Sequence, residues 1–431
     1  MVFSKLFGKS EPPPPERDAV GGDDPVEEEA REPDADWDTR ARRVIVGGAS
    51  TGSKRSDKVY GDARDGGVST HFLSAAGCHV QTVDGDTLVD CTMALGSVAL
   101  GYAEPELTRA VIEALAGGSV AGLSPVLEVD VAERFCGAVP CAERVQFLKT
   151  GAEAVSAAVR IARTYTGRDI VIGCGYFGWH DWSSDAAGVP AATQQSFRRI
   201  PFDDVYALDR AVKEAGDGIA AIVIEPVIER LPSKEWVARA RKVCDEKGAV
   251  LIFDEIKTGF RLATAGYQQY AEVTPDLAAF GKAMANGYPL AAVCGHASLM
   301  EAAEKTWISS TLASETGALM AASAVLAWHE RADVCGSLWS IGKEMRDVVG
   351  KALKASGLTG VSLEGIDPMW LLRFDDAKVE TDFLTVAVKN GVLFKRGAYN
   401  FAALAHDEEA LREIEAGASA AFVELRERDQ R

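Results

Sequence analysis

The sequence predicts an α/β protein whose larger domain is a doubly wound, mostly parallel sheet. Short apolar segments alternate with helix-forming segments, which is the order that successive β-α-β units require. The segments expected to form buried strands are residues 145–149, 169–173, 219–224 and 249–253. With 431 residues, the chain is long enough to bury a large core and to form a smaller second domain.

The helix boundaries between these strands are marked by residues that cap helices. Thr150 and Glu153 have the spacing of a capping box, so a helix should begin directly after the first of the four strands. Another helix is expected over Lys234–Lys247, closed by Gly248. The N-terminus of the first helix carries free backbone N–H groups and therefore suits an anion such as a phosphate.

Two ionisable residues follow apolar segments near the middle of the chain. Asp254 ends the apolar run 249–253, and Lys282 follows the apolar segment 277–280. Ligands of open α/β sheets bind at the carboxyl ends of the strands, so Asp254 should lie at a ligand site. A lysine in an apolar pocket can form an imine with an aldehyde, and a carboxylate can keep a pyridine nitrogen protonated. Together they indicate pyridoxal 5'-phosphate chemistry, although each alone would more simply be a helix cap or a solvated charge.

Around these residues the sequence resembles the central signature of the class-III aminotransferases. The similar segments are DEIKTGFR at 254–261, PDL at 275–277, GK at 281–282 and NGYPL at 286–290. Within this family the chain is most similar to the glutamate-1-semialdehyde aminomutase branch, and the similarity extends from about residue 43 to about residue 406. The resemblance implies the fold-type-I architecture of pyridoxal-phosphate-dependent transferases, with a smaller α+β domain built from both chain ends.

The expected organisation has four segments. They are an acidic, proline-rich tail (1–36), the N-terminal part of the small domain (37–100), the large cofactor-binding domain (101–335) and the C-terminal part of the small domain (336–431). Twelve acidic and five basic residues lie within the first 40 positions, so the tail is expected to be disordered. A solubilising role is the simplest interpretation of this tail, and tethering to a partner protein is the alternative.

The resemblance implies how the cofactor ring would be held. Lys282 would carry the cofactor, Asp254 would face the pyridine nitrogen, and Ile256 would pack on one face of the ring. Tyr176 would stack on the opposite face. Its neighbour Phe177 stands where the family usually has a histidine, which removes a polar group from the pocket edge.

The resemblance also implies phosphate contacts from two subunits. Gly151 and Ala152 match the family's phosphate-binding motif at the start of a helix. Thr311 matches a threonine that reaches the phosphate of the neighbouring subunit's cofactor, so a homodimer with shared active sites is the expected minimum assembly. The residues nearby that depart from the family pattern are Ser310, Ser314 and Glu315.

Substrate contacts are expected from loops near the N-terminus. After the glycine pair at 47–48, either Thr51 or Ser53 would supply a hydroxyl group. Either Arg55 or Lys54 would supply a cation for a substrate carboxylate, which an arginine binds with two parallel hydrogen bonds. An ordinary basic loop is the alternative interpretation.

Two later segments add candidate substrate contacts. Glu225 ends the strand 219–224 and is a candidate pocket residue. Lys395 and Arg396 form a basic pair that suits an acidic substrate, although a solvated surface pair fits the sequence equally well. Ala398 stands where the aminomutase branch has a glutamate, which weakens the assignment to the semialdehyde reaction.

The resemblance implies an enzyme that moves an amino group from a small-molecule amino donor to a carbonyl acceptor, and the basic residues indicate a substrate that carries a carboxylate. An aminomutase would instead return the amino group to a neighbouring carbon of the same molecule. A racemase or epimerase would use the same lysine only to move the α-proton. An inactive cofactor-binding scaffold is the alternative that is not an enzyme.

The composition of the chain limits which kinds of partner and which cellular compartment are expected. The net charge of −18 argues against nucleic acid and anionic membranes as partners. No apolar run approaches the roughly 20 residues of a membrane span, and residues 1–5 lack the apolar core of a secretory signal, which predicts a cytoplasmic location. The eight cysteines form no C-x-x-C pair and are interpreted as reduced, packed residues, so no metal site is expected.

Overall fold

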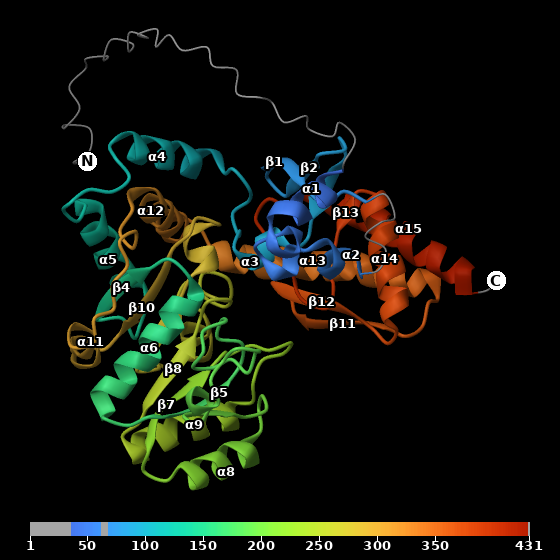
Figure 1. Cartoon of the computed structure of the whole chain (residues 1–431). Helices are drawn as coiled ribbons and strands as arrows, with labels where there is room; N and C mark the ends of the chain where they lie inside the picture. Colours follow the sequence, from blue (N-terminus) through green and yellow to red (C-terminus); the bar gives the residue numbers. More distant parts are fainter. Residues whose placement is uncertain (1–35, 62–67, 430–431) are drawn as a thin grey trace, which may run out of the picture.

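The computed structural model describes residues 36–61 and 68–429, so the expected tail lies almost entirely outside the described residues. Figure 1 shows two parts, one around the strands β4 to β10 and a smaller one that combines the first strands with the last helices. None of the helices in the described part of the chain combines the length and apolar character needed to span a bilayer.

A seven-stranded sheet forms the centre of the larger part. Its strand order is β4-β10-β9-β8-β7-β5-β6, and all neighbouring strands are parallel except β10, which is antiparallel to both β4 and β9. The strands are β4 (Arg144–Leu148), β5 (Ile170–Cys174), β6 (Phe197–Arg199), β7 (Ile219–Ile224), β8 (Val250–Asp254), β9 (Leu277–Phe280) and β10 (Ala291–Gly295). The predicted mostly parallel sheet is therefore confirmed.

Helices cover both faces of this sheet (Figure 1). Successive side chains of a strand point to opposite faces, so Ile222 packs with the cluster that includes α9, while Val223 packs with the cluster that includes α6. Burial on both faces explains why β7 and β8 are apolar at nearly every position. The helices of this part are α4 (Pro105–Ala116), α5 (Val126–Ala138), α6 (Gly151–Thr166), α7 (Ala191–Gln194), α8 (Val205–Ala215), α9 (Lys234–Lys247), α10 (Tyr267–Ala271), η5 (Lys282–Ala285), α11 (Ala297–Glu304) and α12 (Thr316–Arg331).

The smaller part contains two small sheets. In the first, β1 (Phe72–Ala76), β2 (His79–Thr82) and β3 (Thr87–Asp90) are antiparallel, and β13 (Val392–Leu393) adds a parallel strand beside β3. The second is an antiparallel sheet of β11 (Val361–Ile366), β12 (Met369–Phe374) and β14 (Asn400–Phe401). The pairing of β3 with β13 confirms that both chain ends build this part.

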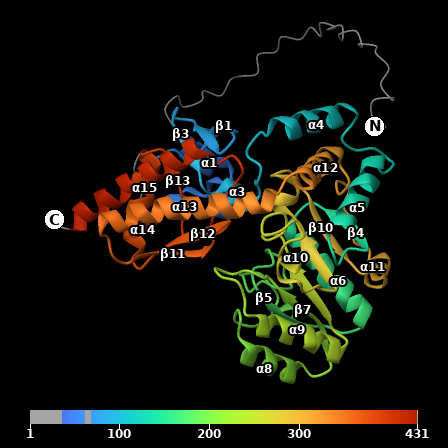
Figure 2. The same cartoon turned by 180° about the vertical axis from the view of Figure 1, so that it is seen from behind.

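The long C-terminal helices pack together on these sheets (Figure 2). The helices of this part are α1 (Trp37–Val44), η2 (Val46–Gly48), η3 (Gly52–Lys54), α2 (Ser56–Tyr60), α3 (Met93–Gly96), α13 (Val334–Ser356), α14 (Ala377–Lys389) and α15 (Glu408–Asp429). The expected boundary between residues 335 and 336 falls within the first turn of α13, whose Leu338 is buried in the main apolar cluster.

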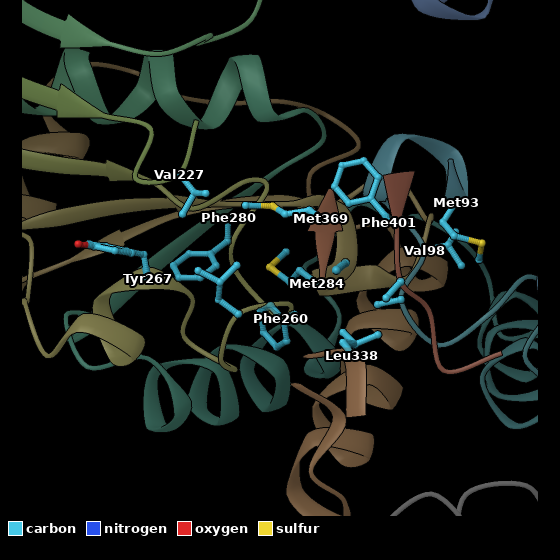
Figure 3. Packing of buried hydrophobic residues seen from close by; sticks show 14 of the residues in the cluster. Met93, Val98, Val227, Phe260, Tyr267, Phe280, Met284, Leu338, Met369 and Phe401 are labelled. Atoms are coloured by element: carbon cyan, nitrogen blue, oxygen red, sulfur yellow. The ribbon is translucent and has the colours of Figure 1, made fainter. Parts of the chain in front are cut away.

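One apolar cluster joins the two parts (Figure 3). Side chains from the larger part, such as Phe260 and Met284, meet Met93, Met369 and Phe401 from the smaller part. All five side chains are almost completely buried. The two parts therefore share a continuous core, in which each stabilises the other through buried apolar surface.

A buried arginine lies inside this junction. The Arg261 guanidinium has no exposed surface and lies over the ring of Phe401, 4.9 Å from its centroid. Burial lowers the pKa of Arg261 to about 10, so the group is still charged at neutral pH. It donates hydrogen bonds of 2.7 to 3.3 Å to the backbone carbonyls of Gly96, Val98, Pro368 and Ala402. One side chain thus ties the loop after β8 to three segments of the smaller part.

Asn286 makes a second link of the same kind. Its side-chain oxygen accepts hydrogen bonds from the backbone N–H groups of Ala99 and Leu100, both at 2.9 Å, and its Nδ2 donates to the carbonyl of Gly101 at 3.0 Å. Asn286 ends η5, the short helix that begins with Lys282. The segment that carries the candidate lysine is therefore held against residues 99–101.

We predict that Arg261→Met destabilises the protein by about 3 kcal/mol or more, because four buried carbonyls lose a donor. Urea unfolding of the cofactor-free protein would measure this as a lower midpoint. Arg160→Met is the matched control, since Arg160 is an exposed arginine on α6, and it should stay within about 0.5 kcal/mol of wild type. Equal stability of the two variants would contradict the proposed link.

Candidate active site

A cavity of about 380 Å³ lies at the carboxyl ends of β7 and β8 and the N-terminus of α6. This is where an α/β sheet places its ligands. The residues assigned to the site from the sequence that line this cavity are Gly151, Ala152, Tyr176, Glu225, Asp254, Ile256 and Lys282. The fold therefore brings together residues that are more than 130 positions apart in the sequence.

Asp254 is a buried carboxylate that lines the cavity. Its side chain ends β8 and is 4% exposed. It accepts a hydrogen bond of 3.1 Å from the backbone N–H of Ile256 and forms no ion pair within the described residues. Burial raises the pKa of Asp254, and the nearby Glu225 raises it further. A protonated ring nitrogen at this position would supply the missing positive charge.

The adjacent carboxylate has a different environment. Glu255 is fully buried and accepts hydrogen bonds from the Thr258 hydroxyl and from the backbone N–H groups of Tyr267, at 2.8 Å, and Gln268, at 2.9 Å. Burial raises its pKa to about 7. Because its oxygens are already satisfied, Glu255 holds the loop after β8 in place and leaves Asp254 to face the cavity.

Lys282 lies directly after β9 in a strained backbone conformation, with φ at 49°. Burial lowers the pKa of Lys282, and the positive charge of Lys257 lowers it further. The preceding Gly281 leaves room beside the lysine, since a Cβ there would lie 3.2 Å from Cδ1 of Ile256. The site therefore favours a neutral, nucleophilic amine.

The N-terminus of α6 presents free donors to the same cavity. The capping box uses the backbone N–H groups of Thr150 and Glu153. Within the described residues, no hydrogen bond uses those of Gly151 and Ala152, both of which line the cavity. Two free N–H groups at the positive end of a helix suit a phosphate.

The loop after β5 carries Tyr176 and approaches α6 closely. A Cβ at Gly178, whose φ is +91°, would lie only 2.4 Å from the Cβ of Ala152, so this contact requires glycine. Tyr176 is 74% exposed, and its backbone N–H donates to Oε2 of Glu225 at 2.9 Å. Phe177 is buried against Trp182, with ring centroids 5.5 Å apart, so it packs the loop onto the core.

Two lysines that line the cavity, Lys149 and Lys257, were not assigned a role from the sequence, and each forms an ion pair. Lys257 pairs with Glu225 at 2.5 Å, and Lys149 pairs with Glu315 at 3.0 Å. Glu315 also caps α12, and hydrogen bonds from Lys149 and the backbone outweigh its burial and lower its pKa. A sequence signal existed for both lysines, because each lies within three residues of a strand end on this edge of the sheet.

Most of the residues assigned to substrate binding lie elsewhere. Ser53 and Arg396 line a second cavity, of about 400 Å³, in the smaller part. Arg396 donates to the Thr381 hydroxyl at 2.8 Å, and Arg55 donates to the Ala49 carbonyl at 3.4 Å. Thr51, also assigned to substrate binding, and Thr311, assigned to the cofactor phosphate, are exposed on loops. The roles of these five residues in substrate or cofactor binding stay predictions.

Comparison with known proteins identifies the family. The family model described as "Aminotransferase class-III" matches residues 62–176 and 180–405. The chain belongs to the class-III aminotransferases. This class-III chain is 30% identical to the 3-aminobutyryl-CoA aminotransferase of Cloacimonas acidaminovorans, with 86% of this chain and 92% of that protein aligned.

Other relatives of this class-III chain have different reactions in their names. It is 34% identical to the 2'-deamino-2'-hydroxyneamine transaminase of Streptomyces kanamyceticus, over 80% of this chain and 86% of the relative. It is 35% identical to the glutamate-1-semialdehyde 2,1-aminomutase of Methanothermobacter thermautotrophicus, but only over 61% of this chain and 64% of that enzyme.

Solved structures support the same fold. The FumI protein of Sphingopyxis sp. MTA144, in its PLP internal aldimine form, superposes with a TM-score of 0.86 at 26% identity, covering 91% of this chain and 96% of FumI. An omega-transaminase from Sphaerobacter thermophilus gives a TM-score of 0.81 at 22% identity, covering 90% of this chain and 97% of that one. The fold-type-I architecture of this class-III chain is thus confirmed.

The cofactor of class-III aminotransferases is pyridoxal phosphate, and the cavity fits it. The free N–H groups of Gly151 and Ala152 suit the phosphate, the buried Asp254 suits the ring nitrogen, and the Lys282 amine suits the aldehyde. The phosphate, the ring nitrogen and the aldehyde of the cofactor would thus each have a complementary group at this cavity.

We predict that Asp254→Asn raises the Kd for pyridoxal phosphate about 10- to 100-fold, because the ring nitrogen loses its counter-charge. Titration of the cofactor-free protein, followed by absorbance, would measure it. Glu255→Gln is the matched control, since the neighbouring carboxylate is bound by Thr258, Tyr267 and Gln268. Glu255→Gln should lower the stability of the protein while changing this Kd far less than Asp254→Asn does. A larger change in Kd for Glu255→Gln than for Asp254→Asn would contradict the assignment of Asp254 to the ring nitrogen.

Proposed function

We propose that this protein is a pyridoxal-phosphate-dependent aminotransferase that moves an amino group from an amino donor to a carbonyl acceptor. The observation that carries the proposal is the meeting of Lys282, Asp254 and the N-terminus of α6 at one cavity. When bound there, the cofactor supplies an aldehyde and a ring that withdraws electrons from the reacting carbon.

The residues of this chain have separate tasks in such a reaction. Lys282, with its lowered pKa, can bind the cofactor through its neutral amine and, once released, carry a proton between two carbon atoms. Asp254 holds positive charge at the ring nitrogen, and Ile256 forms an apolar wall beside Lys282. The loop of Tyr176 closes the other side of the cavity.

An intramolecular aminomutase is the second candidate. The aminomutase relative aligns over 61% of this chain, whereas the two named transaminases align over 86% and 80%. The wider alignment favours transfer between two molecules. A racemase or epimerase would need the same lysine, and an inactive scaffold would not need the lowered pKa of Lys282.

We also propose that one substrate carries a carboxylate. Lys395 supports this proposal, because the residue lines the second cavity, is partly buried and has no ion-pair partner within the described residues. Lys54 lines the same cavity and adds a second positive charge. An anionic group on a substrate would neutralise them.

The expected result with a panel of amino donors is conversion of the bound cofactor to its amine form with release of one carbonyl product per site. Absorbance would follow the cofactor, and mass spectrometry would identify the product. Each donor with a carboxylate is paired with the same amine lacking it, and the carboxylate form should react at lower concentration. Lys282→Ala should lose at least about 100-fold in rate.

Three outcomes would contradict these proposals. Normal turnover by Lys282→Ala without added amine would remove the lysine from the mechanism. A spectral response without a carbonyl product would favour the aminomutase or the racemase. Equal responses to both members of each donor pair would contradict the proposal that the substrate carries a carboxylate.

A homodimer that shares its active sites is proposed from the surface around Thr311. The loops 117–125 and 306–316 lie side by side, since the backbone N–H of Thr316 donates to the Ser119 carbonyl at 2.9 Å. Their exposed apolar side chains are Val120, Leu123, Trp307 and Leu312. Exposed apolar side chains on neighbouring loops are typical of a subunit interface.

Sedimentation equilibrium should therefore give twice the chain mass of 45.9 kDa. Trp307→Glu, which places a charge on an 86% exposed tryptophan of this face, should shift the mass towards one chain. Tyr206→Glu, at an equally exposed aromatic on α8, is the control and should leave the dimer intact. A single-chain mass for the wild type would overturn the proposed assembly.

A further inference from the structure

The cavity contains a second lysine that no role in the reaction accounts for. Lys257 lies three residues after Asp254 and lines the same cavity as Lys282. Its side chain is only 9% exposed, and its Nζ lies 2.5 Å from Oε1 of Glu225. It also lies 4.3 Å from the centroid of the Tyr399 ring, a contact from the smaller part. The ammonium is therefore enclosed by groups that favour its positive charge.

Both oxygens of Glu225 are occupied at the end of β7. Oε1 pairs with Lys257, and Oε2 accepts the backbone N–H of Tyr176 at 2.9 Å. The position of this carboxylate is restricted further by Gly175, where a Cβ would lie 2.4 Å from the Cβ of Glu225. Glu225 is consequently held on Lys257 and does not form an ion pair with Lys282.

We propose that Lys257 is a positioning residue that keeps Lys282 neutral, by holding the Glu225 carboxylate in an ion pair and by placing its own positive charge in the same cavity. This inference rests on the proposed role of Lys282 as the lysine that binds the cofactor. It assigns a task to Lys257 that goes beyond that role, because the reaction needs one amine without its proton and the cavity is also lined by Lys149 and Lys257.

The charged groups that face Lys282 come from three places. Asp254 at the end of β8 and Glu225 at the end of β7 both favour the protonated amine, while Lys257 and Arg261 from the loop after β8 oppose it. Burial has the largest effect and also favours the neutral amine. Among the charged groups, Lys257 has the largest effect on Lys282.

The two amines are shifted in opposite directions. Burial alone would lower the pKa of Lys257, but the Glu225 carboxylate and Tyr399 raise it above its ordinary value. Lys282 forms no ion pair within the described residues, and burial together with the Lys257 charge lowers its pKa. The ion pair thus separates a lysine that stays charged from a lysine that loses its proton readily. An uncharged link between β7 and the loop after β8 would have no such electrostatic effect on Lys282.

Competitive acetylation of the full chain, stripped of cofactor, tests this inference. Trace acetic anhydride reacts only with neutral amines, and mass spectrometry would quantify the labelled Lys282 peptide over about pH 6 to 10. The midpoint is the pH at which labelling of Lys282 reaches half of its maximum. In the wild type this midpoint should lie below the ordinary lysine pKa of about 10.4. Lys257→Gln should raise it by about one pH unit, so labelling of Lys282 at neutral pH falls about tenfold.

The direction in which each variant should move the midpoint of Lys282 follows from the charge that it removes or keeps. In Lys257→Gln, the loss of the ammonium and the release of the Glu225 carboxylate both favour protonated Lys282. Lys257→Arg keeps the pair and should restore the wild-type midpoint. Glu225→Gln removes the partner but keeps the Lys257 charge, so the midpoint should move down. Lys149→Gln is the matched control, since it removes the other paired lysine of this cavity, and it should leave the midpoint unchanged.

An unchanged midpoint in both Lys257→Gln and Glu225→Gln would overturn the proposal, as would equal shifts in Lys257→Gln and Lys149→Gln. If either Lys257→Gln or Glu225→Gln failed to fold, the other variant would still show whether the midpoint of Lys282 moves in the expected direction. The measurement requires neither cofactor nor turnover, so it is independent of whether the enzyme transaminates. Borohydride reduction of the cofactor-loaded protein, followed by peptide mapping, would show separately whether Lys282 is the lysine that binds the cofactor.

Discussion

The burial of Arg261 between the two parts of the molecule is the constraint on which the remaining structure depends. Its guanidinium donates hydrogen bonds to four backbone carbonyls from three separate segments. Breaking this arrangement would leave a buried charge and buried carbonyls unsatisfied together. Arg261 lies in the same loop as Asp254, so the junction between the parts and the shape of the cavity are set by one short stretch of chain.

The cavity shows how burial divides similar residues between different tasks. Asp254 and Glu255 are adjacent and both almost fully buried, but only Glu255 has its oxygens satisfied by the surrounding loop. Lys257 and Lys282 share one cavity, but only Lys257 has a carboxylate partner. In both pairs the residue with fewer partners among the described residues is the one that we propose to contact the cofactor. Unsatisfied charge in a low-dielectric cavity is what makes a group reactive.

The sequence predicted those features that depend on neighbours along the chain. The expected strand 219–224 coincides with β7, and the expected helix Lys234–Lys247 coincides with α9, which Ser233 and Gly248 cap. The capping box of Thr150 and Glu153 is also formed. Apolar runs, caps and glycines act within a few residues, so they are readable without the fold. The long signature around Asp254 and Lys282 identified the family for the same reason.

By itself, the amino-acid sequence determined the family, the order of the elements and the residues expected around the cofactor, because these are recorded in local patterns. Only the tertiary structure decided which of the charged residues are paired. These pairings depend on segments that are distant along the chain. Examples are the ion pair of Lys257 with Glu225, the hydrogen bonds of Arg261 to the carbonyls of Gly96 and Ala402, and the hydrogen bond of Arg396 to Thr381. The energy of a charge is set by its surroundings in space, and those exist only after the chain has folded.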